Sequence, residues 1–277
     1  MIKAYKCALL GEQIEAVLKL LEDSENEVEI QLLSIEDDLS LIDCFQGRVS
    51  SIHLPIEKED RTCNLTTVIK ACKEQNGKYY FLNKVAAYAT RENAGIVIHA
   101  NVPVENFCKM QGYKEFIEWV KQYNVKIFLE NTMEITDARK SILTPVLAKD
   151  RINSELKEKL CFPLLDICHF QVSYNQYNSN LRRNLSEVLS LYAYDLMRIH
   201  LCSVIGNGND RKGGVHGSNF KENLELLEEI LKDVYKWNPI LILEENESDM
   251  INKPNAVWLN NKIDEIVLKQ NYKYKTI

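Results

Sequence analysis

The sequence has no apolar stretch approaching the roughly 20 residues that a membrane-spanning helix needs. Its first residues, Met1-Ile2-Lys3-Ala4-Tyr5-Lys6, lack the charged and apolar regions of a signal peptide. The 8 cysteines form no CxxC pair, and several lie in apolar runs, which is typical of reduced, buried thiols. We therefore expect a cytoplasmic protein with no membrane partner.

The chain also lacks long repeats, low-complexity tracts and Pro/Gly-rich linkers, which favours one domain over residues 1–277. Lys+Arg total 34 against Asp+Glu 40, and this net charge of -6 argues against a broad electrostatic footprint for nucleic acid, although it allows a local basic patch. The length is close to the about 250 residues of a typical α/β barrel.

Eight apolar, strand-like runs alternate with segments of helical period, and this alternation predicts a parallel sheet with crossover helices. We predict strands at residues 3–9, 28–33, 49–55, 95–100, 125–131, 162–168, 196–202 and 239–244. We predict helices at residues 12–25, 35–45 with Ser34 as N-cap, 65–93 with a break near Asn76-Gly77, 113–123, 154–160, 180–191, 220–237 and 260–270. Strands and helices alternating in this way predict an α/β fold of the (β/α)8 TIM-barrel type.

Potential metal ligands follow six of these runs. The chain has only 5 histidines, and four of them lie at or just past the end of a predicted strand, while the fifth follows a strand in a Gly-rich loop. In a barrel the C-terminal strand ends share one rim, so these side chains should converge. The candidate ligands are His53, His99, Glu130, Asp166, His169, His200, His216 and Glu244.

Four of these residues, Glu130, Asp166, His200 and Glu244, offer carboxylates and an imidazole to a common point. That donor set suits Mn²⁺, Zn²⁺, Co²⁺ or Mg²⁺. Taken singly, a strand-end His is often only hydrogen-bonded, and a strand-end Glu often pairs with Lys or Arg. The repetition favours one divalent ion. The other histidines would suffice for two or three, and Glu130 could then bridge two ions about 4 Å apart, a spacing suited to in-line attack on a phosphodiester.

The motifs SIHLP, VIHAN, FLENT, LLDICH, RIHLCS and ILEEN, in this order from His53 to Glu244, resemble the xylose isomerase-like TIM-barrel superfamily. That superfamily contains endonuclease IV and many sugar or sugar-phosphate isomerases and epimerases. In the isomerase branch, the resemblance implies one metal held at Glu130, Asp166, His200 and Glu244. It further implies that the two glutamates move a proton next to a carbonyl, and that His169 touches the substrate.

In the endonuclease IV branch, the resemblance implies three zinc ions held by all eight candidate ligands, in an AP endonuclease that cuts DNA at abasic sites. All five histidines match this branch, but three segments depart from it. The chain begins Tyr5-Lys6-Cys7-Ala8-Leu9-Leu10 in place of a His-Ser and Gly-Gly signature. An expected Asp-Arg-His is Gly214-Val215-His216, so the third zinc would need Asp210, and a Gly-rich segment is Met133-Glu134-Ile135-Thr136.

These departures favour a sugar or sugar-phosphate isomerase or epimerase with catalytic Glu130, Glu244 and His169. The alternative is an endonuclease IV-like zinc phosphodiesterase, the only hypothesis with a nucleic-acid partner. A third hypothesis is a non-catalytic barrel that binds a partner through its metal rim. Arg211 and Lys212 are candidate contacts to a substrate phosphate, and Tyr174 could stack on a sugar or base. A homo-oligomer is left open.

Overall fold

The computed structural model describes residues 1–56, 63–132, 138–170, 181–192, 198–204, 216–217, 220–221, 224–234, 237–244 and 254–275, some of them by backbone alone. Parallel strands form a closed barrel in the order β1-β10-β7-β6-β5-β4-β3-β2. The barrel strands are β1 Lys3–Ala8, β2 Glu27–Gln31, β3 Val49–His53, β4 Gly95–His99, β5 Lys126–Glu130, β6 Cys161–Asp166, β7 Arg198–Leu201 and β10 Ile240–Leu243. The predicted TIM barrel is confirmed.

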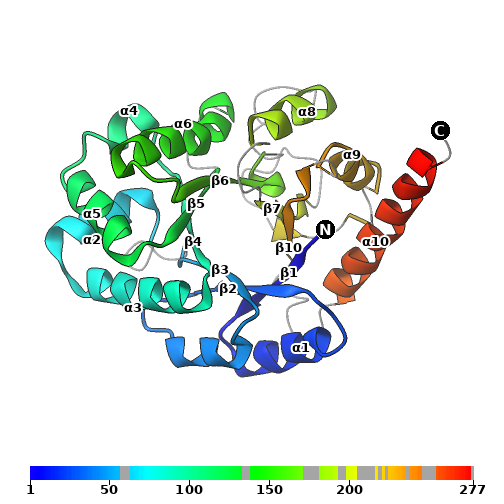
Figure 1. Ribbon diagram of the computed structural model, residues 1–277, viewed down its shortest axis with the longest axis horizontal. Coiled ribbons are helices and arrows are strands. Elements are labelled where there is room, and N and C mark those ends of the chain that lie inside the picture. Colours follow the sequence, from blue (N-terminus) through cyan, green and yellow to red (C-terminus); the bar gives the residue numbers. More distant parts are fainter. Residues whose placement is uncertain are drawn as a thin grey trace.

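Helices surround the strands on the outside of the barrel (Figure 1). They are α1 Gly11–Leu21, the 3-10 helix η1 Leu39–Phe45, α2 Leu65–Glu74, α3 Gly77–Glu92, α4 Val104–Phe107, α5 Tyr113–Tyr123, α6 Ala138–Leu156, α8 Leu181–Tyr192, α9 Leu224–Val234 and α10 Pro254–Lys275. The short strands β8 Ser203–Val204 and β9 His216–Gly217 pair antiparallel outside the barrel. Within the described ranges, no helix is both long and apolar enough to cross a membrane.

Two predicted features of the helices are present in the structure. Helix α5 covers the predicted residues 113–123. The predicted break between α2 and α3 is present because Gln75 adopts a left-handed conformation with φ of 50°, and the Asn76 side chain accepts a hydrogen bond from the Tyr79 N–H. Asparagine at this position caps the first turn of α3.

Two predicted helices differ from the structure. The helix predicted at 154–160 has the wrong bounds: its first three residues are the end of α6, which stops at Leu156, and the Asn153 side chain accepts hydrogen bonds from the N–H groups of Leu160 and Cys161. Pro145 lies inside α6, where proline disfavours a helix, so local propensity gives no signal for it.

The helix predicted at 35–45 is shorter than expected. It is the 3-10 helix η1, and its N-cap is Asp38, whose side chain accepts from the Ser40 N–H. Ser34 is therefore not the N-cap. Asp37 instead accepts hydrogen bonds from the N–H groups of Leu33 and Ser34 and closes the turn before η1.

The barrel interior is filled by a small apolar layer made of Val97, Phe128, Phe162 and Leu164. Successive side chains in a strand alternate between two faces, so a residue two positions later points to the same side. Glu130, Asp166 and His99 each follow one of these apolar residues by two positions and therefore also point inward. The candidate ligands form the next layer toward the C-terminal rim.

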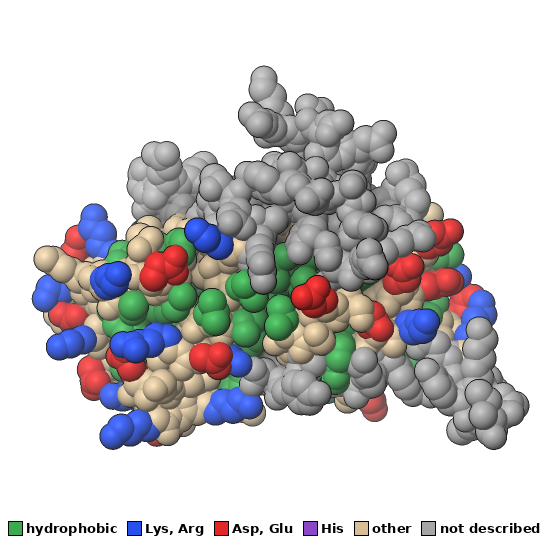
Figure 2. All heavy atoms as spheres, turned by 90° about the horizontal axis from the view of Figure 1, so that it is seen from above, with side chains coloured by type: hydrophobic (Ala, Val, Ile, Leu, Met, Phe, Trp, Pro, Cys, Tyr) green, Lys and Arg blue, Asp and Glu red, His purple; other side chains and the backbone are tan. Residues whose placement is uncertain are grey.

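The face of the described part that is seen in Figure 2 mixes charges of both signs. Figure 2 shows Lys and Arg side chains interspersed with Asp and Glu, and no histidine is visible among the described side chains on this face. This agrees with the burial of the histidines whose side chains are described, His53, His99, His169 and His200.

Gly112 should be essential for the packing of α5 on α2. Its φ is +100°, and a Cβ there would lie 2.3 Å from the Ile69 carbonyl oxygen. We expect Gly112→Ala to lower the free energy of unfolding by about 1–3 kcal/mol, measured by urea denaturation. Gly77 is the matched control, because a Cβ there meets nothing within 4 Å, and Gly77→Ala should be neutral or stabilising by up to about 1 kcal/mol. Equal losses in both variants would contradict this account.

Candidate metal centre

The candidate ligands lie side by side because the strands that carry them are in register. His99 on β4 pairs with Glu130 on β5, and Asp166 on β6 pairs with His200 on β7. All four side chains are buried. One layer of the barrel therefore collects imidazoles and carboxylates that lie far apart in the sequence.

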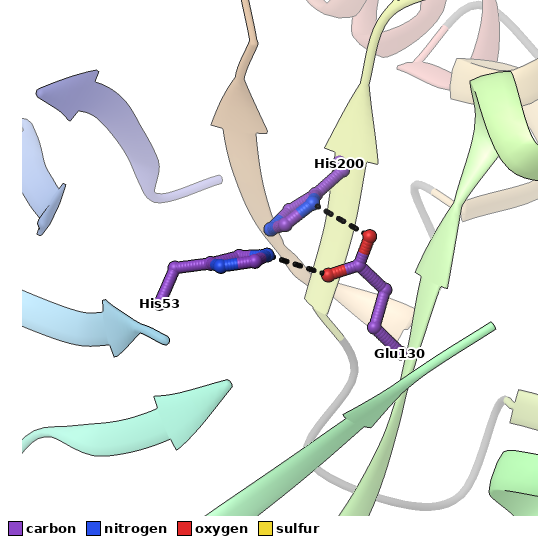
Figure 3. A group of neighbouring side chains, drawn as sticks. All are labelled: His53, Glu130 and His200. Carbon is purple, nitrogen blue, oxygen red and sulfur yellow. Dashed lines mark hydrogen bonds and ion pairs between the residues drawn. The ribbon is translucent and has the colours of Figure 1, made fainter. Parts of the chain in front are cut away.

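Glu130 is at the centre of this layer. Its Oε2 lies 2.9 Å from His53 Nε2, and its Oε1 lies 3.3 Å from His99 Nε2 and 3.2 Å from His169 Nδ1. Figure 3 shows the rings of His53 and His200 pointing at different oxygens of this carboxylate. Glu130 is only 1% exposed, so histidines surround both of its oxygens in a site that excludes bulk water.

His200 faces three carboxylates with one ring nitrogen. Its Nδ1 lies 3.6 Å from Glu130 Oε1, 3.6 Å from Asp166 Oδ2 and 3.4 Å from Glu244 Oε2. The structure thus brings together the four residues that the sequence assigns to a single ion.

One ring nitrogen of His53 and one of His169 contact backbone carbonyl oxygens. His53 Nδ1 lies 2.8 Å from the Leu54 carbonyl oxygen, and His169 Nδ1 lies 2.7 Å from the Asn131 carbonyl oxygen. A carbonyl oxygen only accepts, so these Nδ1 atoms carry the hydrogen. The Nε2 of a neutral His53 would then present a lone pair to Glu130. Two facing acceptors require a cation between them, either a proton or a metal ion.

The donor atoms group into overlapping triads in which all atoms lie within 4.8 Å of one another. Each triad could hold a metal ion, and Glu130 and His200 each belong to two of them. The triads are His53–Glu130–His200, His99–Glu130–His169, Asp166–His200–Glu244 and Asp166–Cys168–Cys202.

Two buried nitrogens support this interpretation. Among the described residues, neither His99 Nε2 nor His200 Nδ1 has a hydrogen-bond partner. Buried polar atoms are rarely left in this state unless an ion or water completes the site. Imidazole and carboxylate together suit divalent transition metals or Mg²⁺, so the residues present fit such an ion.

Asn131 fixes the spacing between β5 and β6 just above the ligands. Its Oδ1 accepts from the Asp166 N–H at 2.7 Å, and its Nδ2 donates to the Asp166 carbonyl at 3.1 Å. The Asp166 side chain in turn accepts from the His169 N–H at 2.6 Å. These bonds hold Glu130, Asp166 and His169 in a fixed arrangement.

Two charged residues in this layer have no counterpart in the sequence prediction. Lys6 on β1 forms a close ion pair with Glu244 Oε1. Glu29 on β2 lies 2.9 Å from His200 Nε2. A charged residue between buried neighbours, as in Tyr5-Lys6-Cys7 or Val28-Glu29-Ile30, is the signal that could have identified both.

The remaining candidates lie outside this description. Arg211, Lys212, Tyr174 and Asp210 are not among the described residues. For His216, the structure gives the backbone of β9 and its pairing with Val204, but not the side chain.

The pKa values follow from burial and from the crowding of opposite charges. Burial alone would lower the pKa of His200, but Glu29, Glu130 and Glu244 outweigh it and raise that pKa well above its usual range. Burial also opposes the shift of His169, whose pKa Asp166 and Glu130 raise to about 10. Burial lowers the pKa of His99 to about 4, despite the nearby Glu130. Burial would raise the pKa of Glu130, but His99 and His200 hold it well below its usual value.

The fold and site define a TIM-barrel protein with a buried cluster able to hold divalent metal. No family model matches the sequence, and a search of curated proteins found no match. Among solved structures, the barrel is similar to dihydropteroate synthase from Thermus thermophilus in complex with 6HMPPP, at 10% identity over 94% of this chain and 93% of that chain, with a TM-score of 0.45. Orotidine 5'-monophosphate decarboxylase from Sulfolobus solfataricus matches at 8% identity over 95% and 100%, with a TM-score of 0.40.

At such low TM-scores these two enzymes carry no argument about function, and the assignment of the fold rests on the closed parallel barrel itself. Membership of the xylose isomerase-like superfamily stays a prediction from the motifs.

Metal binding should release protons. Because the pKa values of His200 and His169 are raised, both rings are protonated in the metal-free protein at neutral pH. Ring nitrogens bind metal only after losing their protons, so affinity for Zn²⁺ should rise with pH until the pH reaches the folded pKa of His169, about 10. Calorimetric titration in buffers of different ionisation enthalpy measures the proton count. Binding that is independent of pH would contradict this expectation.

The raised pKa of His169 also makes the stability of the metal-free protein depend on pH. His169 has a folded pKa above its ordinary value, so its contribution to stability is fully present below 6.5 and is lost as pH rises through about 10. Chemical denaturation with a chelator present should therefore show stability falling over this alkaline window. A loss confined to acid pH would contradict the assigned charges.

Proposed function

We propose that this protein is a divalent-metal-dependent hydrolase of phosphate esters, with more than one ion held around Glu130. The observation that carries the proposal is the placement of a histidine Nε2 on each oxygen of this carboxylate, His53 at Oε2 and His99 at Oε1. A carboxylate flanked in this way is suited to bridging two ions. One ion bound to a single oxygen would need only one of these two histidines.

Proton transfer next to a carbonyl, the leading hypothesis from sequence, needs Glu130 and Glu244 as effective bases. Histidines hold the pKa of Glu130 well below its usual value, and Lys6 forms an ion pair with Glu244. A general base works best when its pKa is near the working pH. Both glutamates are therefore better suited to holding cations than to abstracting a proton from carbon.

Divalent ions in these triads would act as Lewis acids toward a phosphate oxygen and would increase the acidity of a nucleophilic water. The chain's own residues supply the frame for this chemistry. Glu130, Asp166 and Glu244 hold negative charge where the ions are needed, and Asn131 fixes the spacing of Glu130 and Asp166. Lys6 neutralises one oxygen of Glu244 and leaves the other facing His200.

A sugar or sugar-phosphate isomerase or epimerase is the second candidate, with Glu130 and Glu244 moving a proton and His169 orienting the substrate. The three carboxylates around His200 Nδ1 favour it, because they match the single-ion set. Arg211, Lys212 and Tyr174 stay proposed substrate contacts in both cases. An abasic-site duplex belongs only to the hydrolase proposal.

The number of bound ions separates the two candidates. We expect protein purified without chelator and loaded with Zn²⁺ to hold at least two ions, measured by elemental analysis and native mass spectrometry. His99→Ala should remove one ion and leave the Asp166–His200–Glu244 triad loaded, whereas Glu130→Ala should affect both sites. Glu27→Gln, at the start of β2, is a matched control that should change nothing. One ion in the unmodified protein would favour the isomerase.

The reaction itself is tested with Zn²⁺, Mn²⁺ and Co²⁺ on four substrates: bis(p-nitrophenyl) phosphate, p-nitrophenyl phosphate, an abasic-site duplex and a panel of ketose phosphates in D₂O. We expect ester hydrolysis, with kcat/KM falling by about a hundredfold or more in Glu130→Gln and unchanged in Glu27→Gln. Carbon–hydrogen exchange in a ketose phosphate, without any ester hydrolysis, would replace the hydrolase by the second candidate.

A further inference from the structure

A carboxylate with no role in the predicted ligand set lies beneath the candidate metal centre. Glu29 points into the barrel from β2, is 0% exposed, and is in register with Lys6 on β1. We propose that Glu29 is a positioning residue that orients the His200 ring so that Nδ1 faces the metal. This inference rests on the metal-binding part of the proposed function.

The two oxygens of Glu29 have different partners. Oε2 accepts a hydrogen bond from Ser51 Oγ at 2.7 Å, which anchors the carboxylate to β3. Oε1 lies 2.9 Å from His200 Nε2, although the N–H direction is off the line of a hydrogen bond. Among the described residues neither Oε1 nor Nε2 has a hydrogen-bond partner, and the contact that each makes is the ion pair with the other.

Nearby cations stabilise the buried carboxylate of Glu29. Burying an isolated carboxylate is very unfavourable. Lys6 lies on the neighbouring strand, and its charge helps to hold the pKa of Glu29 at about 2, although burial opposes this and His200 contributes most. Arg198 donates to Ser51 Oγ at 3.3 Å and to the Ser50 carbonyl at 3.0 Å, with its guanidinium 4.3 Å from the centre of the Phe128 ring.

The contact between Glu29 and His200 Nε2 determines where Nδ1, at the opposite edge of the ring, points. With Nε2 directed at Glu29, Nδ1 faces Glu130, Asp166 and Glu244 at 3.4–3.6 Å. A ring turned over about its Cβ–Cγ bond would present carbon to these carboxylates. A carboxylate behind a metal-binding histidine fixes the ring and makes the other nitrogen a stronger donor, and its loss typically weakens binding by about 10–100-fold.

The test compares Zn²⁺ affinity, measured by competition with a chromophoric chelator, in the unmodified chain and three variants. Glu29→Leu should weaken binding by about 10–100-fold. Glu29→Gln keeps an acceptor oxygen and should recover part of that loss. Glu27→Gln, on the same strand, should bind like the unmodified chain. Circular dichroism establishes which variants are folded.

A spectroscopic readout reports the ring orientation without any variant. In the zinc-loaded protein, ¹⁵N chemical shifts of the His200 ring should show zinc on Nδ1 and hydrogen on Nε2. If Glu29→Leu does not fold, Glu29→Gln and this spectrum decide the question.

The outcomes separate the positioning role of Glu29 from the existence of the metal centre. Zinc bound to His200 Nε2 would overturn the positioning role and leave the metal centre standing. A zinc affinity equal to that of the unmodified chain in every folded Glu29 variant would do the same. An unmodified protein that binds no zinc would remove the metal centre and the inference together.

Discussion

Charge buried inside the barrel is the constraint on which the rest of the structure depends. Glu29, Glu130, Asp166 and Glu244 all lie at or below 7% exposure in one region of the interior. Removing carboxylates from water costs several kcal/mol each unless cations and hydrogen bonds replace the solvent. In the metal-free chain Lys6 and the protonated rings of His169 and His200 supply that positive charge. Under the proposed function, divalent ions would take the place of these protons between the same carboxylates.

The architecture could be predicted because it depends on local and periodic signals. Alternating apolar runs identified the barrel, and the left-handed Gln75 followed by the cap at Asn76 marks the break between α2 and α3. The predicted site depended on one rule, that C-terminal strand ends meet on one rim. The structure brings His53, His99, Glu130, Asp166, His169, His200 and Glu244 together as that rule requires. Their chemical roles are a separate matter and stay proposals.

What could not be predicted depends on the closure of the barrel. Lys6 and Glu29 lie on the first two strands, and only the pairing of β1 with β10 brings Lys6 to Glu244. Sequence spacing carries no information about that contact, because 238 positions separate the two residues. Most of helix α6 was not predicted for a different reason: Pro145 lowers the local helix propensity, and packing against β6 and its neighbours overrides it.

The side chain of Asn131 has a consequence for how this protein can change over evolution. By bonding to both the N–H and the carbonyl of Asp166, it acts as one more residue of strand pairing between β5 and β6. The segments that continue toward the rim can then vary in length and composition without altering the distance between Glu130 and Asp166. Under the proposed function, this side-chain pairing would separate the metal-binding residues of the interior from the residues that recognise the substrate. One ion-holding scaffold could therefore acquire new substrates through loop replacement alone.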